Sequence, residues 1–146
     1  MENAHNSPTP PSFELGELAE RLGIKIIEIN ESSAQATMPV AGNRQPAGFL
    51  NGGATGTLIE TLASRAANQL VNPKGLIAVG AELHVSHLRP ATKGHVTAVS
   101  KLVHLGKTTS LFSVEVFNEE EKLTATGTLR CNHIPKPAES GEPDRK

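Results

Sequence analysis

The chain of 146 residues contains no tryptophan, no tyrosine and only four phenylalanines. Single-stranded nucleic acids are bound by stacking bases on aromatic side chains, and this sequence has too few of them to form such a surface. It also lacks an excess of positive charge, since 14 lysine and arginine residues are balanced by 15 aspartate and glutamate residues. Nucleic-acid-binding domains usually carry a strong basic excess. Both absences argue against a nucleic-acid partner.

Cysteine and long apolar runs are equally scarce. Cys131 is the single cysteine, which excludes an intramolecular disulfide and favours a reducing compartment. No segment approaches the ~20 apolar residues that a membrane-spanning helix needs. Residues 1–12 are polar and proline-rich, without the apolar core of a signal peptide. We therefore expect a cytoplasmic protein with no membrane partner.

Composition divides the chain into three parts. Residues 1–12 and residues 135–146 are rich in proline and polar or charged residues, which is typical of disordered segments. Residues 13–134 lie between them and are sufficient for one domain with a single core. The sequence thus predicts one folded domain with a disordered segment at each end.

The spacing of apolar residues predicts the order of the elements. Residues 13–22 have helical spacing and are followed by Gly23, a residue that commonly ends a helix. Residues 24–30 are rich in isoleucine, and residues 33–40 alternate between apolar and polar side chains, so both segments predict strands. The first part of the domain is therefore expected to be a short helix and two strands.

A long helix and four strands are predicted to follow. Apolar residues between Leu58 and Leu70 recur at helical spacing over most of the helix girth, and the pattern closes near residues 71–75. Four consecutive strands with tight turns favour an antiparallel meander, and one long helix must cover a face of it. The predicted fold class is α+β, with an antiparallel sheet wrapped around a long central helix. The four alternating segments are residues 77–86, 95–103, 108–117 and 123–131.

The stretch that opens the long helix contains groups suited to catalysis. Gly52 and Gly53 stand at the helix start, where unpaired backbone N–H groups and the positive end of the helix dipole point outward. Glu60 follows two turns later, within the apolar pattern. A carboxylate buried there is costly unless it is paired or functional. Amide donors followed by a carboxylate predict a thioester or ester hydrolysis site.

The same stretch carries a family resemblance. Residues 45–54 read Gln-Pro-Ala-Gly-Phe-Leu-Asn-Gly-Gly-Ala, and Glu60, residues 78–80 (Ala-Val-Gly), Arg89-Pro90 and Leu105-Gly106 follow at fixed spacing. With these motifs residues 24–132 resemble hot-dog acyl-CoA thioesterases of the phenylacetate-degradation type. Within that family the chain is most similar to the 4-hydroxybenzoyl-CoA and 1,4-dihydroxy-2-naphthoyl-CoA thioesterases.

The resemblance implies roles for individual residues. Glu60 corresponds to the catalytic acid, as nucleophile or general base, and the backbone N–H of Gly52 to the group that polarises the thioester carbonyl. Gln45 corresponds to an amide near the thioester, and Ser64 to a hydroxyl that orients the attacking water. Asn51 occupies a position where the family usually has histidine, and an amide can donate a hydrogen bond but cannot transfer a proton at neutral pH. The residues expected to bind the substrate's coenzyme A are Gly53, Arg89, Lys107 and Thr108.

The predicted function is hydrolysis of an acyl-CoA, with an aromatic acyl group favoured, by a homodimer or homotetramer whose active site lies at the subunit interface. No metal or organic cofactor is implied. His84 and His87 are three residues apart on a predicted strand and should point to opposite faces, which argues against a metal pair. One alternative is a non-catalytic acyl-CoA-binding hot-dog module, which Asn51 alone supports. Another is a hot-dog dehydratase, which needs a histidine near the central helix, and no histidine lies between residues 6 and 83.

Overall fold

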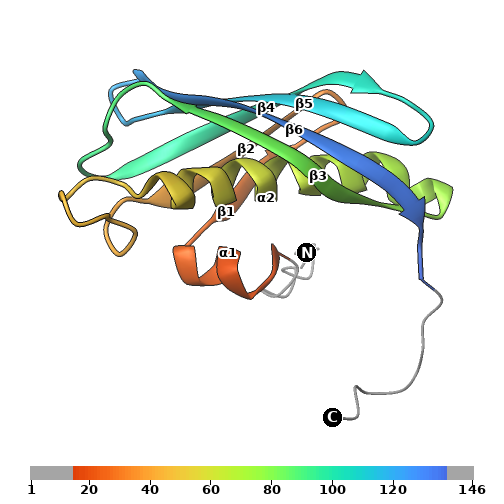
Figure 1. Cartoon of the computed structure of the whole chain (residues 1–146), viewed down its shortest axis with the longest axis horizontal. Helices are drawn as coiled ribbons and strands as arrows, with labels where there is room; N and C mark the ends of the chain where they lie inside the picture. The colour runs from red at the N-terminus through yellow and green to blue at the C-terminus, as the bar shows by residue number, and fades with distance from the viewer. Residues whose placement is uncertain (1–14, 138–146) are drawn as a thin grey trace, which may run out of the picture.

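The computed structural model describes residues 15–137, so the predictions for residues 1–12 and for the tail beyond residue 137 lie outside the described residues. A six-stranded antiparallel sheet curves around one long helix, and a short helix lies on the side of that helix away from the sheet (Figure 1). The predicted α+β architecture, an antiparallel sheet wrapped around a long central helix, is confirmed.

The long helix α2 (Gly52–Val71) packs one face against the concave side of the sheet. It ends in a short 3₁₀ turn, η2 (Asn72–Lys74), where Gly75 takes the left-handed conformation at φ 74°, in agreement with the predicted closure. No helix within residues 15–137 is long and apolar enough to cross a membrane. The buried apolar residues of α2 are Ala54, Leu58, Ile59, Leu62, Ala63, Ala66, Ala67 and Val71.

The first elements follow the predicted order. The short helix α1 (Glu17–Leu22) ends at Gly23, which has a left-handed φ of 74°. Strands β1 (Lys25–Ile29) and β2 (Ser33–Pro39) pair antiparallel. Alternate residues of β2 are fully buried, as the sequence pattern predicts, and these are Ala34, Ala36 and Met38.

The position of strand β3 (Leu76–His87) differs from the prediction. Strands β4 (His95–Leu105), β5 (Thr109–Phe117) and β6 (Leu123–Pro135) form a meander, but β3 pairs with β6 at the sheet edge. The predicted meander of four consecutive strands is wrong because β2 already pairs with β4 on the side that β3 would need. Residues 88–94 therefore carry the chain across the sheet from β3 to β4.

Strand β3 is interrupted by a register shift. The shift lies between Gly80 and Glu82, so Ala81 is an extra residue relative to β6. The predicted alternation placed Gly80 and Leu83 on opposite faces. In the structure both face α2: a side chain at Gly80 would collide with Glu60, and Leu83 lies against the first half of the helix. A bulge leaves no mark in apolar spacing, which explains the wrong prediction.

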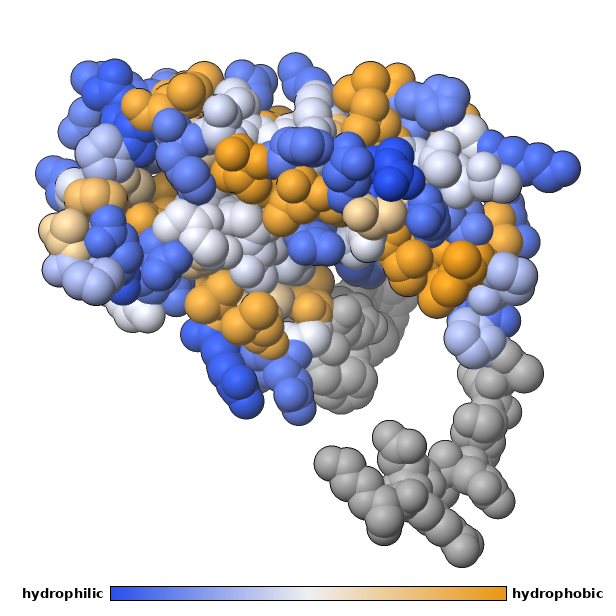
Figure 2. Space-filling view, in the orientation of Figure 1, coloured by the Kyte–Doolittle hydropathy of each residue, from blue (hydrophilic) through white to orange (hydrophobic). Residues whose placement is uncertain are grey.

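The start of β3 is fastened to α2 by one amide side chain. Asn68 Nδ2 donates to the carbonyl of Ala78 at 3.0 Å, and the Ala78 N–H donates to Asn68 Oδ1 at 2.9 Å. Elsewhere β3 is exposed. Figure 2 shows the side of the molecule that carries α1 and β3, where apolar side chains are spread among polar ones. The exposed large apolar residues on these two elements are Leu18, Val79 and Leu83.

Candidate active site

The loop before α2 is held in place by hydrogen bonds from a buried asparagine and from its own backbone. Asn43 is buried, and its Nδ2 donates to the carbonyls of Leu22 and Pro39 at 2.7 and 2.8 Å. The Leu50 N–H donates to the carbonyl of Ala91 at 2.8 Å. The loop is thereby fixed against the crossover segment that follows β3.

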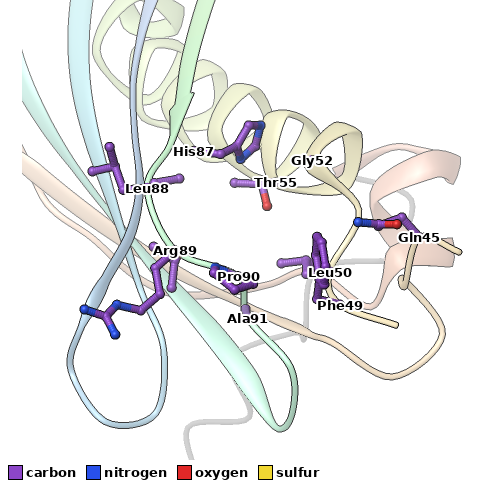
Figure 3. A pocket seen from close by; sticks show the side chains of 12 residues that line it. Gln45, Phe49, Leu50, Gly52, Thr55, His87, Leu88, Arg89, Pro90 and Ala91 are labelled. Carbon is purple, nitrogen blue, oxygen red and sulfur yellow. The ribbon is translucent and has the colours of Figure 1, made fainter. Parts of the chain in front are cut away.

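A cavity of about 410 Å³ opens where this loop meets the first turn of α2 and the end of β3 (Figure 3). Its wall combines apolar side chains with a small number of polar groups, which is typical of ligand sites. Phe49 and Leu50 supply apolar surface. The polar side of the wall includes Gln45, Gly52, His87 and Arg89.

The first turn of α2 presents a free backbone donor to this cavity. Asn51 is the N-cap, and its Oδ1 accepts a hydrogen bond from the Gly53 N–H at 2.7 Å. The N–H groups of Ala54 and Thr55 donate to the Asn51 carbonyl. Among residues 15–137 the Gly52 N–H has no acceptor, as expected for the start of a helix. Gly52 can therefore donate to a ligand, whereas the N–H of Gly53 and the side-chain oxygen of Asn51 are already engaged.

Gln45 lies in the same cavity and also retains a donor. Its Oε1 accepts the Ala47 N–H at 2.8 Å, so the Nε2 group has no acceptor within the described part of the chain. The tight turn around it needs Gly48 at φ 94°. The structure thus brings together the predicted site residues Gln45 and Gly52.

Glu60 and Ser64 line a different cavity, of about 550 Å³, between α1 and α2. They lie one turn apart on the same helix face. The expected burial of Glu60 is wrong for a single chain, because the residue is exposed beside strand β3 at the edge of the sheet. Its carboxylate has no hydrogen bond or ion pair within residues 15–137. It lies directly over Gly80 of β3, where only a hydrogen leaves room for it.

One chain does not bring Glu60 to the cavity that contains Gly52. A helix rises about 1.5 Å per residue, so the two residues are about 12 Å apart along the axis of α2. A glutamate side chain is too short to bridge that distance. The predicted acid and the predicted carbonyl-binding amide therefore belong to separate cavities in the single chain.

The residues expected to bind coenzyme A are also separated. Arg89 follows the end of β3 and lines the first cavity, where its N–H donates to the Thr124 carbonyl at 3.2 Å. Lys107 and Thr108 are exposed in the turn between β4 and β5. The carbonyl of Thr108 accepts the N–H of His133, which pairs with the start of β3. The two groups thus lie at opposite ends of the sheet.

His87 is a residue of the cavity that the sequence analysis did not assign. Figure 3 shows its ring projecting from the end of β3 toward the first turn of α2. An ideal Cβ placed on Gly52 would lie 2.8 Å from His87 Nε2. The expectation that no histidine lies near the central helix is therefore wrong. Strand alternation already places His87 on the same face as Leu83, and the missing information was that β3 runs beside the start of α2.

The other titratable groups near the sheet do not add a nucleophile or a metal site. His84 points away from α2 and lies 2.9 Å from Glu82 Oε1, so His84 and His87 face opposite sides, as predicted. Burial and the charge of Glu60 raise the pKa of Cys131 to about 11, so this thiol stays protonated at neutral pH. Residues 15–137 contain no group of three His, Cys, Asp or Glu side chains that could hold a metal ion.

The sequence is similar to known thioesterases and esterases. The family model described as the thioesterase superfamily matches residues 47–125. A candidate esterase of Deinococcus radiodurans is 40% identical over 82% of this chain and 75% of its own. The proofreading thioesterase EntH of Cronobacter turicensis is 35% identical, over 79% and 84% of the two chains. The 1,4-dihydroxy-2-naphthoyl-CoA hydrolase of Escherichia coli is 34% identical, over 78% and 84%.

Solved structures give the same result. The thioesterase HI1161 of Haemophilus influenzae matches with a TM-score of 0.79 and 32% identity, over 84% of this chain and 86% of that one. Two variant structures of SAV0944 from Staphylococcus aureus match with TM-scores of 0.78 and identities of 28% and 29%, over 81% and 82% of this chain and 98% and 99% of theirs. In one variant a glutamine, and in the other a glutamate, is replaced by alanine.

Proposed function

Since the chain belongs to the thioesterase superfamily, we propose that it hydrolyses an acyl-CoA to the free acid and coenzyme A. The predicted hot-dog family and the predicted enzyme class, thioester hydrolase, are confirmed by these matches. The acyl-CoA substrate and the residues that act on it belong to the proposal.

The observation that carries the proposal is the free N–H of Gly52 inside a cavity that Gln45 also lines. A thioester carbonyl bound there develops negative charge as a nucleophile adds to it. A backbone donor at a helix start stabilises that charge, and one such donor is worth about 3–4 kcal/mol in studied enzymes. The Gln45 amide is close enough to line the same space and supplies a further hydrogen-bond donor near the thioester.

Glu60 supplies the attacking oxygen in this proposal. Its carboxylate either adds to the carbonyl carbon directly or removes a proton from a water molecule that adds to it. Ser64, one turn further along α2, lines the same cavity and orients that water. Exposure and the absence of an ion pair within residues 15–137 leave the Glu60 carboxylate available.

A second copy of the chain completes the site. In one chain Glu60 is too far from the Gly52 N–H, whereas strand β3 has an edge that no other described strand covers. Pairing of two β3 edges would place Glu60 of the partner subunit beside the first cavity. In the S. aureus variants, the replaced glutamine and glutamate have the same separation along the chain as Gln45 and Glu60, which supports pairing these two residues in one reaction.

The acyl group is proposed to be aromatic because the E. coli relative is named for an aromatic acyl-CoA. We assign binding of the coenzyme A nucleotide to Arg89 of one subunit and to Lys107 and Thr108 of the partner subunit, since cations and hydroxyls suit phosphates.

The proposed reaction uses no metal or organic cofactor. We propose that it takes place in the cytoplasm, where the single Cys131 remains reduced.

Release of coenzyme A, followed with a thiol reagent, tests this function. Benzoyl-, 4-hydroxybenzoyl-, phenylacetyl- and straight-chain acyl-CoA should be compared with wild-type protein and with Glu60→Ala. We expect fastest turnover on an aromatic substrate and a loss of about 10²–10⁴-fold in kcat for Glu60→Ala. Acyl-CoA that binds without being hydrolysed by wild-type protein would instead identify a binding module.

A further inference from the structure

The first cavity contains a side-chain donor beside the Gly52 N–H that the proposed reaction has not used. His87 Nε2 lies 2.8 Å from the point where a Cβ on Gly52 would be. A Cβ is roughly 2.5 Å from the backbone nitrogen of its own residue. The two nitrogen atoms are therefore at most about 5.3 Å apart, and one oxygen between them can be within hydrogen-bonding distance of both.

The nitrogens of the His87 ring are available to a ligand, and the backbone that carries the ring is held by hydrogen bonds. Its nitrogens have no hydrogen-bond partner among residues 15–137, and the side chain lines the cavity. The residue pairs with Ala125 at the end of the β3–β6 ladder. Directly after it, the Leu88 N–H donates to the Thr124 carbonyl at 2.8 Å. These bonds fix the backbone that carries the ring and leave the ring nitrogens unoccupied.

The other polar side chain at the helix start is not equally available. The Asn51 oxygen caps α2 through the Gly53 N–H, which fixes the direction of the amide. His87 comes from another element and approaches Gly52 from the β3 side (Figure 3). Oxyanion sites gain most from donors that are in place before the reaction. The fixed backbone of His87 and its place beside Gly52 favour that condition.

We propose that His87 Nε2–H donates a second hydrogen bond to the carbonyl oxygen of the thioester held by the Gly52 N–H. The inference rests on the proposed thioesterase function. Water adds to the carbonyl carbon while Glu60 of the partner subunit takes its proton, and the carbonyl electrons move to the oxygen between the two donors. When that oxyanion collapses, the carbon–sulfur bond breaks and the thiolate receives the proton from Glu60. His87 donates a hydrogen bond and transfers no proton in these steps.

The test compares His87→Ala and His87→Gln with wild-type protein on two substrates. One is an acyl-CoA that wild-type protein hydrolyses, and the other carries the same acyl group on N-acetylcysteamine, which lacks the nucleotide. We expect His87→Ala to lower kcat by about 10²–10³-fold on both substrates with little change in KM. His87→Gln, whose amide keeps a donor, should recover part of that loss.

His84→Ala is the matched control. His84 is on the same strand, three residues away, and points to the opposite face of the sheet, so its replacement should leave kcat unchanged. Thermal unfolding of each variant separates loss of the donor from loss of the fold.

Two results would overturn the inference while leaving the thioesterase function intact. One is a folded His87→Ala protein with kcat within twofold of wild type. The other is a rise in KM for the acyl-CoA alone, which would make His87 a nucleotide contact. If wild-type protein hydrolyses neither substrate, the proposed function itself fails, and the role of His87 in it is rejected together with that function.

Discussion

The two cavities along α2 are built in opposite ways. The one at the helix start is formed by loops and by the end of β3, and its donors are held by several backbone hydrogen bonds. The one beside Glu60 lies between two helices, and its carboxylate has no hydrogen bond or ion pair within the described residues. The first is suited to binding a carbonyl in a fixed geometry, and in the proposed reaction the carboxylate of the second acts on a carbonyl bound by the partner subunit.

The largest expected change is the recovery of activity when two inactive variants, one defective in each cavity, form hybrid dimers. Glu60→Ala and Gln45→Ala subunits should each be poorly active alone. If a site takes Glu60 from one subunit and Gln45 from the other, every hybrid dimer contains one intact site, and random mixing should restore about a quarter of wild-type activity. Co-expression of two differently tagged variants, followed by a kcat measurement, provides the check. A site contained within one chain predicts no restoration.

A smaller effect is expected within the first cavity. Gly52→Ala keeps the backbone N–H but places a Cβ 2.8 Å from His87 Nε2 and 3.1 Å from its Cε1, so the ring must move. Displacement of a positioned group by about 1 Å can cost about 10²-fold in rate, and we expect a loss of that order in kcat. The double variant Gly52→Ala/His87→Ala should unfold at a higher temperature than the sum of the single effects predicts, because the collision is removed. Additive unfolding temperatures would contradict this contact.

Removal of the helix cap should affect stability more than chemistry. Asn51→Ala removes the acceptor of the Gly53 N–H, and loss of such a cap costs about 1 kcal/mol. For a domain of this size that lowers Tm by about 2–4 °C. Calorimetry measures the shift, with Asn51→Asp as the control because a carboxylate also caps a helix start. An unchanged Tm in Asn51→Ala would show that the cap does not stabilise the fold.

The smallest effect concerns Cys131, a buried thiol whose pKa is raised by burial and by the charge of Glu60. Its pKa is raised from an ordinary 9.0 to about 11, mainly by burial, so the folded protein holds this proton to higher pH than the unfolded chain does. The contribution of the protonated thiol to the free energy of unfolding is therefore fully present below pH 9, and it is lost as the pH rises toward 11. Urea unfolding at pH 7, 9 and 10.5 should show a steeper loss in wild-type protein than in Cys131→Ala. Parallel losses would refute a role for the buried thiol.

Local patterns in the sequence predicted much of this fold. Helical spacing between Leu58 and Leu70 located α2, alternation located β2, and Gly23 marked the end of α1, because each pattern arises within one segment. The edge position of β3 depends on which distant strand pairs with it. The bulge at Ala81 is set by register against β6, and neither feature has a local signal.

The residues of the candidate site also differ in whether a local pattern can identify them. Gln45, Gly52, Asn51 and Glu60 are close in sequence, and a motif can identify them together. His87 reaches the helix start only because β3 returns beside α2, and no local pattern shows that return. The roles of all these residues in catalysis stay predictions until the variants are measured.

The amide of Asn68 has a consequence for how copies of the chain assemble. A free strand edge is a template on which sheets of other molecules can continue without limit. Asn68 occupies both backbone groups of Ala78, so the edge is already satisfied at that point, as if a short strand had been added there. An added strand can pair only beyond Ala78, along the part of β3 that leads to His87. Association at this edge is thereby restricted to a limited range of registers, and the amide acts against open-ended polymers.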